Sequence, residues 1–343
     1  MKNLHNIPQK TYTALQKLLS EKKKIVVTTH KNPDGDAMGS ALGMYLFLKK
    51  LGHDVSIVTP NEYPEFLRWL PSEKEVVKFN TNKNNANDLF QKAEIIFCLD
   101  FNNFERLSGM EKSLSDLKKI FVLIDHHPMP KIKTDMMFSV IEVSSTAELI
   151  YDVLVNINAT KLIDKDIAEC LFTGIMTDTG SFSYSCSRPG TFRVVTELLK
   201  FGIEIDKIHS LVYNNFSANR MKLLGYCLNN KMKIFPQYRT AYISLSSEEL
   251  KKYKFKPGDD EGIVNYPLSI KGIIFSGFFI EKKDHVKISF RSKGSFPANK
   301  FSTENFQGGG HLNAAGGKSE EKFEECLNRF ENLLPKYKKE LNN

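Results

Sequence analysis

Two residue types that bind divalent metal ions, aspartate and histidine, recur in four short stretches of the first part of the chain. Each stretch taken alone has an ordinary structural explanation. Asn-Pro-Asp-Gly is a strong turn signal, a carboxylate beside a helix start is a common cap such as Asp36 could be, and histidine pairs often fill surface or core. Their joint occurrence instead favours a metal site. The candidate residues are His30, Asp34, Asp36, Asp100, Asp125, His126, His127 and Asp178.

The chemistry follows from the donor set, which combines carboxylates and imidazoles without thiolates. Cys98, two residues before Asp100 in an apolar run, is interpreted as a core residue. Oxygen and imidazole donors suit manganese, or magnesium, better than a structural zinc ion. Two divalent ions that share carboxylates can lower the pKa of a bridging water and stabilise charge on a phosphoryl group. The donor set therefore predicts phosphoester hydrolysis.

The elements that must position these donors have the pattern of an α/β domain. Strand-like runs cover 25–29, 55–58, 94–99 and 119–124, and they alternate with helical segments such as 37–51. This alternation predicts a mostly parallel sheet flanked by helices. Several runs are apolar throughout, as expected for strands covered on both faces.

The donors follow the ends of these strands. His30, Asp100 and Asp125 each come directly after, or at the end of, an apolar run. Ligands of open α/β sheets collect beyond the carboxyl ends of the strands, so these side chains are expected to meet at one edge. Gly39, close to the start of the next helix, is expected to let a substrate approach backbone N–H groups.

A second, smaller α+β domain is predicted for the remainder of the chain. The expected boundaries are 1–187 for the first domain, 188–230 for a helical connector and 231–343 for the second domain. Ser246 with Glu249 three residues later is a capping-box pattern. The expected strands are 232–235, 240–245, 272–281 and 286–291, with a closing helix over 320–334.

Composition limits the class of protein. The 343 residues have a formal net charge of +8, which is compatible with phosphate-bearing partners but does not require them. The five cysteines show no CxxC pair and are interpreted as reduced thiols. The polar start of the chain, Met1–Lys24, has no apolar signal-peptide core and no later stretch is long enough to span a bilayer, so cytoplasmic residence without membrane association is expected.

The motifs resemble those of the DHH phosphoesterase superfamily. HxxPDGDAxGS, a lone Asp after a strand, Asp-His-His and TDTGSF occur in the order and spacing of that superfamily over 25–182. The second part resembles the DHHA1 domain through Val264-Asn265, Phe290-Arg291-Ser292 and the GGGHLNAAG sequence from Gly308. Together these motifs resemble the nanoRNase and 3′-phosphoadenosine-5′-phosphate (pAp) phosphatase group, the NrnA-like proteins. Gln307 departs from the pattern, because a fourth glycine often stands there.

The resemblance implies a role for each matching residue. One metal ion would be held by His30, Asp34 and Asp100, and the other by Asp36, Asp100, His126 and Asp178. Asp100 would bridge both ions, His127 would contact the scissile phosphate or assist the departing oxygen, and Asp125 would support the ligands from outside. The active site would lie in a cleft between the DHH and DHHA1 domains. The substrate-binding residues would be Asn265, Arg291, Ser292, Gly308, Gly309, Gly310 and His311.

Arg291 and the glycines also have a chemical reason to bind substrate. The guanidinium of Arg291 is a planar fork suited to a terminal phosphate, and successive glycine N–H groups can form a concave set of donors. The expected substrates are short oligoribonucleotides (nanoRNA) and pAp, with linear or cyclic dinucleotides as an alternative. A non-catalytic RNA-binding module is the alternative of another class, and the complete ligand set argues against it. Pairing of two chains through the DHH domain is a further implication of the resemblance.

Overall fold

The computed structural model describes residues 7–342, so Met1–Asn6 of the polar N-terminal stretch lie outside the described residues. The chain divides into two compact units, Met1–Asn215 and Phe216–Asn343. The helices expected to form a connector are divided between the two units. The first unit contains α7 (Pro189–Leu199) and α8 (Ile205–Tyr213), and the second begins with α9 (Ala218–Tyr226).

The first unit is built on a parallel sheet of six strands, which confirms the predicted α/β fold. The strand order is β3-β2-β1-β4-β5-β6. Four strands match the predicted runs, whereas the short edge strands β3 and β6 carry too few residues to show a pattern. The strands are β1 (Lys24–Thr28), β2 (Asp54–Thr59), β3 (Val76–Lys78), β4 (Ile95–Leu99), β5 (Ile120–Asp125) and β6 (Met136–Ser139).

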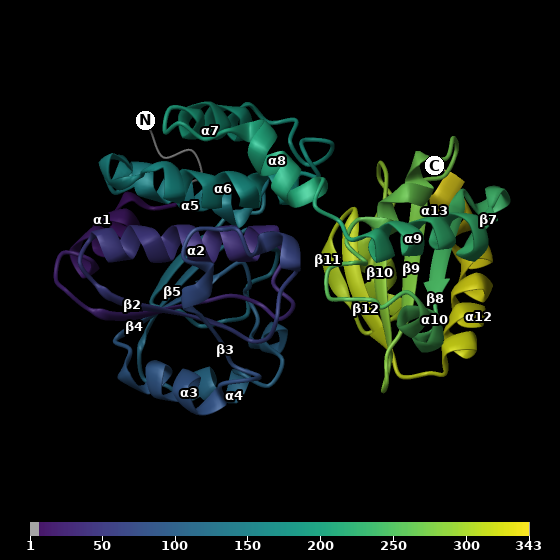
Figure 1. The fold of residues 1–343 in the computed structure, drawn as a ribbon, viewed down its shortest axis with the longest axis horizontal. Helices are drawn as coiled ribbons and strands as arrows, with labels where there is room; N and C mark the ends of the chain where they lie inside the picture. The colour runs from purple at the N-terminus through teal and green to yellow at the C-terminus, as the bar shows by residue number, and fades with distance from the viewer. Residues whose placement is uncertain (1–6, 343) are drawn as a thin grey trace. The chain divides into compact units, whose positions relative to one another are not determined.

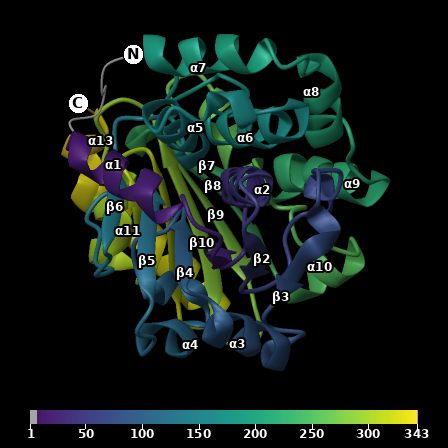
Figure 2. The same ribbon diagram turned by 90° about the vertical axis from the view of Figure 1, so that its left-hand side faces the viewer.

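Helices cover both faces of this sheet, which explains the continuous apolar strands. The helices α2, α5 and α6 lie on one face, while α3 and α4 lie on the other (Figures 1 and 2). The α-helices are α1 (Gln9–Leu18), α2 (Gly35–Lys50), α3 (Lys83–Lys92), α4 (Glu111–Ser115), α5 (Thr146–Asn156), α6 (Lys165–Asp178), α7 (Pro189–Leu199) and α8 (Ile205–Tyr213). The 3₁₀ helices are η1 (Glu65–Leu67), η2 (Glu73–Glu75), η3 (Phe104–Leu107) and η4 (Thr160–Leu162).

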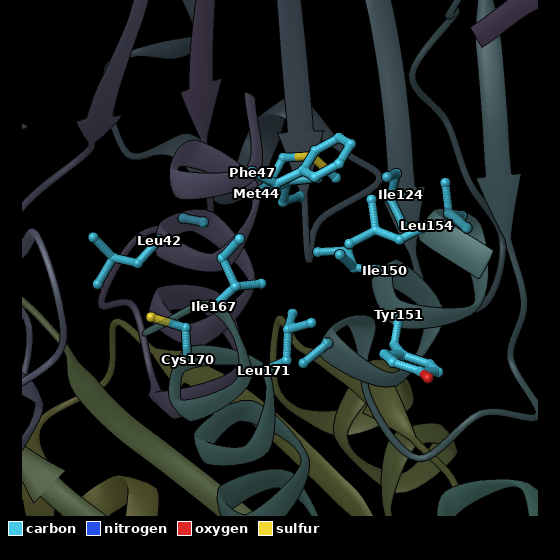
Figure 3. Packing of buried hydrophobic residues seen from close by; sticks show 14 of the residues in the cluster. Leu42, Met44, Phe47, Ile124, Ile150, Tyr151, Leu154, Ile167, Cys170 and Leu171 are labelled. Atoms are coloured by element: carbon cyan, nitrogen blue, oxygen red, sulfur yellow. The ribbon is translucent and has the colours of Figure 1, made fainter. Parts of the chain in front are cut away.

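Helix α2 is buried nearly all round because the sheet, α5 and α6 enclose it. Figure 3 shows side chains of α2, α5 and α6 in one buried cluster, among them Leu42 and Phe47 of α2, Ile150 of α5 and Ile167 of α6. Full burial of one such side chain contributes about 1.5–3 kcal/mol to stability. This packing fixes the start of α2, where two of the predicted metal ligands lie.

Gly39 serves this helix packing, which corrects the expectation that it admits a substrate. A Cβ atom at position 39 would lie 2.4 Å from the carbonyl oxygen of Cys170 and 2.9 Å from the nitrogen of Gly174. Both residues belong to α6. The glycine therefore lets α2 and α6 approach closely. The position of Gly39 in the sequence does not indicate that α6 packs against it.

The second unit has a mixed sheet with the order β11-β12-β10-β9-β8-β7, in which β8 and β9 run parallel and the other neighbours antiparallel. The predicted α+β class and the capping box at Ser246 and Glu249 are confirmed. The strands are β7 (Met232–Phe235), β8 (Thr240–Leu245), β9 (Phe275–Glu281), β10 (Val286–Ser292), β11 (Gly309–His311) and β12 (Ala314–Ser319). The helices are α9 (Ala218–Tyr226), the π-helical η5 (Cys227–Lys231), η6 (Pro236–Tyr238), α10 (Ser247–Lys252), η7 (Ile263–Ser269), α11 (Ala298–Asn305), α12 (Phe323–Leu333), η8 (Leu334–Tyr337) and α13 (Lys338–Asn342).

An aromatic cluster fills one face of this second sheet. The ring centroid of Phe290 on β10 lies 5.4 Å from that of Phe275 and 5.9 Å from that of Phe330 on α12. Residues of α9 and η7, such as Leu223 and Ile263, pack on the opposite face. None of the helices in residues 7–342 combines the length and the apolar character needed to cross a membrane.

Candidate metal centre

The centre lies where the strand order of the first sheet reverses direction. β1 is followed along the chain by its neighbour on one side, β2, whereas β4 is followed by its neighbour on the other side, β5. Thr28 pairs with Cys98, so His30 and Asp100 both lie two residues beyond a paired position. Ligands of open α/β sheets bind at such a switch point. The fold thus brings the two loops together.

Asp34 both caps α2 and faces the centre. Its Oδ1 accepts hydrogen bonds from the backbone N–H groups of Asp36, at 3.1 Å, and Ala37, at 3.0 Å. Its Oδ2 lies 3.9 Å from Nε2 of His30. The cap of this helix is therefore Asp34 rather than Asp36, and one carboxylate oxygen of the cap remains directed toward the imidazole.

Asp100 faces two histidines through different oxygen atoms. Its Oδ2 lies 3.2 Å from Nε2 of His30, and its Oδ1 lies 3.6 Å from Nε2 of His126. The backbone of Asp100 has a φ of 64°, a left-handed conformation that costs on the order of 1 kcal/mol or more outside glycine. The N–H of Asp100 donates to the carbonyl of Ile124 at 3.1 Å, which holds the turn in place.

A second donor group surrounds His126. Its Nε2 lies 3.5 Å from Oδ2 of Asp178 and 3.8 Å from Oδ2 of Asp36. Asp178 is the last residue of α6, and Asp36 is in the first turn of α2. One group thus contains His30, Asp34 and Asp100, the other contains Asp36, His126 and Asp178, and the donor atoms within each group lie within 4.8 Å of one another.

The buried carboxylates of the centre would be stabilised by a nearby positive charge. Burial raises the pKa of Asp36 well above its usual range, and the nearby carboxylates of Asp100 and Asp178 raise it further. Burial also raises the pKa of Asp100, but the interactions with His30, His127 and His126 outweigh burial and hold this pKa below its usual range. Several carboxylates in a buried space are stable as anions only beside cations.

The protonation pattern of His30 fits a metal ligand. Its Nδ1 lies 2.8 Å from the carbonyl oxygen of Lys31, and because a carbonyl only accepts, Nδ1 carries the proton. The buried Nε2 makes no hydrogen bond although two carboxylates face it. In the tautomer that binds a metal ion, Nε2 directs its lone pair toward these carboxylate oxygens and is repelled by them. A divalent cation between these atoms would remove that repulsion, so the residues present fit such an ion.

Asp125 fixes the position of His127 through two hydrogen bonds. Nδ1 of His127 lies 2.8 Å from Oδ1 of Asp125, and the backbone N–H of His127 donates to Oδ2 at 3.0 Å. Burial, with the charge of Asp100, raises the pKa of the Asp125 carboxyl to about 8. A carboxylate in this position orients an imidazole and fixes its tautomer. The structure therefore places Asp125 behind His127.

Sequence reasoning missed Thr146, which contacts the carboxylates of both donor groups. Its backbone N–H donates to Oδ2 of Asp36 at 2.7 Å, and its hydroxyl donates to Oδ1 of Asp100 at 2.9 Å. The N–H of Ala147 donates to Oδ1 of Asp36 at 2.9 Å. Ser145 and Glu148 have capping-box spacing, a signal that could have located this helix start. Nothing in that spacing shows which carboxylates the helix meets.

In the second unit, Arg291 and Ser292 end β10. The side chain of Arg291 is partly exposed, and its Nη1 donates to the carbonyl oxygen of Phe290 at 2.9 Å. The hydroxyl of Ser292 is buried, donates to the carbonyl of Phe296 and accepts from Asn313. Ser292 therefore stabilises the strand end that carries Arg291.

The glycines predicted to donate N–H groups to substrate lie at the start of a strand pair, β11 with β12. Gly309 pairs with Gly316, and His311 pairs with Ala314. A Cβ atom at Gly308 would lie 2.1 Å from the carbonyl oxygen of Gly316, so the chains approach too closely for a side chain. Asn265 lies in η7, on the side of the sheet opposite the aromatic cluster.

Comparison with known proteins identifies both parts of the chain. Residues 24–175 match the family described as "DHH family, N-terminal domain", and residues 239–339 match the "DHHA1 domain". The bifunctional oligoribonuclease and PAP phosphatase NrnA of Thermus thermophilus is 28% identical over 323 residues, which are 91% of this chain and 90% of that protein.

Solved structures agree with this assignment. An exopolyphosphatase-related protein from Bacteroides fragilis is 39% identical, with a TM-score of 0.94 and full coverage of both chains. RecJ of Thermus thermophilus in complex with Mn²⁺ is 14% identical with a TM-score of 0.56, covering 97% of this chain and 56% of that one. The likeness to RecJ concerns the fold.

Proposed function

The chain belongs to the DHH phosphoesterase family and carries its DHHA1 domain, and from this we propose that it hydrolyses short oligoribonucleotides and pAp with two divalent metal ions. The observation that carries the proposal is the pair of donor groups that meet at the two oxygens of Asp100. The substrate class is supported by the relative named an oligoribonuclease and PAP phosphatase, whose length the chain matches almost throughout.

The ligand sets follow the two groups. We assign His30, Asp34 and Asp100 to one ion, and to the other the set Asp36, Asp100, His126 and Asp178. Manganese suits these oxygen and imidazole donors, and magnesium is the alternative. When bound, such ions acidify a water molecule and neutralise charge on the phosphoryl oxygens. The protein's part is to hold the carboxylates in position, which the start of α2 and the N-terminus of α5 achieve.

His127 is the proposed acid on the leaving side. Because Asp125 binds its Nδ1, the ring presents Nε2 as the atom that can reach a substrate. A proton or hydrogen bond from Nε2 would stabilise the departing oxygen as the P–O bond breaks. Asp125 keeps the ring in this orientation.

The second unit is proposed to bind the end of the substrate. Arg291 would form charge-assisted hydrogen bonds with a terminal phosphate, and N–H groups of Gly308, Gly309 and Gly310 would add donors beside His311. Asn265 is the weaker candidate for a contact to ribose or base. Ser292 would contribute indirectly, because its hydroxyl is already engaged at the end of β10. Recognition of a terminal phosphate favours substrates with a free phosphorylated end.

A substrate panel tests the proposal. The Mn²⁺-loaded protein would be assayed with pAp, RNAs of increasing length, linear and cyclic dinucleotides and pyrophosphate, with a chelator-treated sample as control. We expect kcat/KM to be highest for pAp and the shortest RNAs, and to vanish on chelation. Preference for cyclic dinucleotides would move the assignment to that substrate class. RNA binding without turnover of any compound would contradict the proposal.

A further inference from the structure

A single arginine, Arg106, lies at the same edge of the first sheet as the metal centre. It belongs to η3, a short helix that begins four residues after Asp100. Its Nη1 donates to the backbone carbonyl of Asp100 at 3.3 Å. Its own carbonyl accepts a hydrogen bond from the N–H of Lys31 at 2.7 Å, next to His30. Arg106 is thus attached to both loops that carry ligands of the first donor group.

The guanidinium of Arg106 has no carboxylate partner within ion-pair distance in the described part of the chain. Two other arginines of this unit are paired: Arg68 lies 3.0 Å from Glu73, and Arg193 lies 2.9 Å from Asp152. The one bond to the Asp100 carbonyl uses one of five N–H donors and is long. Most of the hydrogen-bonding capacity of this half-buried cation therefore remains available.

The charge of Arg106 acts on the centre. It opposes the rise in the pKa of Asp125 that burial and the charge of Asp100 produce. A phosphate group entering beside these carboxylates would meet strong repulsion from them. A guanidinium can bind two oxygens of one phosphate through parallel N–H bonds, which fixes the orientation of the group as well as neutralising it.

We infer that Arg106 binds a non-bridging oxygen of the substrate phosphate at the metal centre, as a phosphate-binding residue of the first unit separate from Arg291. The inference rests on the proposed phosphoesterase function, because it assigns Arg106 to the scissile phosphate. The competing explanation is a purely structural one, in which Arg106 only holds the left-handed turn at Asp100.

Inorganic phosphate is the probe that separates these two explanations. Its affinity for the Mn²⁺-loaded full-length protein, measured by calorimetry, needs no turnover. Arg106→Gln should weaken phosphate binding and raise KM for pAp by about 10- to 100-fold, the range expected for a charge-assisted hydrogen bond. Arg106→Lys should fall between this variant and the unchanged protein, because it keeps the charge but loses the fork.

Two further measurements control for structure and charge. Mn²⁺ affinity and the melting temperature of Arg106→Gln should match those of the unchanged protein. Lys118→Gln removes an exposed charge at the amino end of β5, far from the centre, and should leave phosphate affinity within about twofold. Loss of Mn²⁺ binding in Arg106→Gln, or unchanged phosphate affinity, would overturn the inference. If Arg106→Gln weakened phosphate binding but the unchanged protein hydrolysed no nucleotide, the inference about Arg106 would stand and only the proposed function would be refuted.

Discussion

The two units place polar groups in different ways. In the first, the donor residues come from the ends of β1, β4 and β5, from the start of α2 and from α6, and they meet because parallel strands end at one edge. In the second, the candidate substrate residues lie on adjacent antiparallel strands, where Arg291 pairs directly with Ala314 and Ala314 with His311. The first arrangement depends on the order of the whole sheet, whereas the second depends on local pairing.

The difference also extends to burial. Asp36, Asp100 and His126 are at most 5% exposed, while Arg291 is partly exposed and His311 is likewise accessible. Buried carboxylates suit a site in which charge is concentrated to hold cations, and accessible donors suit the capture of an anion from water. We therefore expect changes of the buried metal ligands in the first unit to lower kcat, and changes of the accessible donors in the second unit to raise KM.

The largest effect is expected at Asp100. Asp100→Asn keeps the shape and a residue type that tolerates a positive φ, but it removes the charge shared by both donor groups. We expect kcat for pAp to fall by about a thousandfold or more, since metal-assisted charge stabilisation amounts to several kcal/mol. The matched control is Asp88→Asn, at an exposed position of α3. A near-normal kcat in Asp100→Asn would refute the assignment of shared ligands.

An intermediate effect is expected at Thr146, whose hydroxyl orients Asp100. Thr146→Val should weaken Mn²⁺ binding by about 10- to 100-fold, the usual cost of losing a group that orients a ligand, and Thr146→Ser should restore it. The measurement is an Mn²⁺ titration with the electron paramagnetic resonance spectrum of the bound ion.

Thr173→Val is the matched control for Thr146. The hydroxyl of this buried threonine donates to the carbonyl of Glu169 in its own helix, at 2.7 Å. Equal losses of Mn²⁺ affinity in both variants would show that the effect is general destabilisation of the helices.

The smallest effect is expected at Arg291. Arg291→Ala should raise KM for pAp by about 10-fold with little change in kcat, because the lost hydrogen bonds hold the substrate equally before and during reaction. Lys283→Ala, at the exposed turn before β10, controls for net charge in the same unit. If Arg291→Ala lowered kcat and left KM unchanged, the expected difference between the two units, in which the second acts on KM, would be wrong.

Sequence patterns located most of the fold. The runs that became β1, β2, β4 and β5 were recognisable because they are apolar, and the capping box at Ser246 follows a local rule. The strands β11 and β12 were missed because their glycines resemble a loop, and only strand pairing makes them a sheet edge. Gly39 was misinterpreted because the residues that require a glycine there belong to α6, more than a hundred residues further along the chain.

The identities of the donor residues, and their positions after apolar strands, are properties of the sequence alone, because strand character and turn chemistry act over a few residues. The tertiary structure alone decided that opposite oxygens of Asp100 face His30 and His126, that Thr146 reaches both carboxylates, and that Arg106 stays unpaired beside them. The physical reason is that residue spacing does not encode strand order: β1 and β4 become neighbours only when the whole sheet has formed around its reversal point.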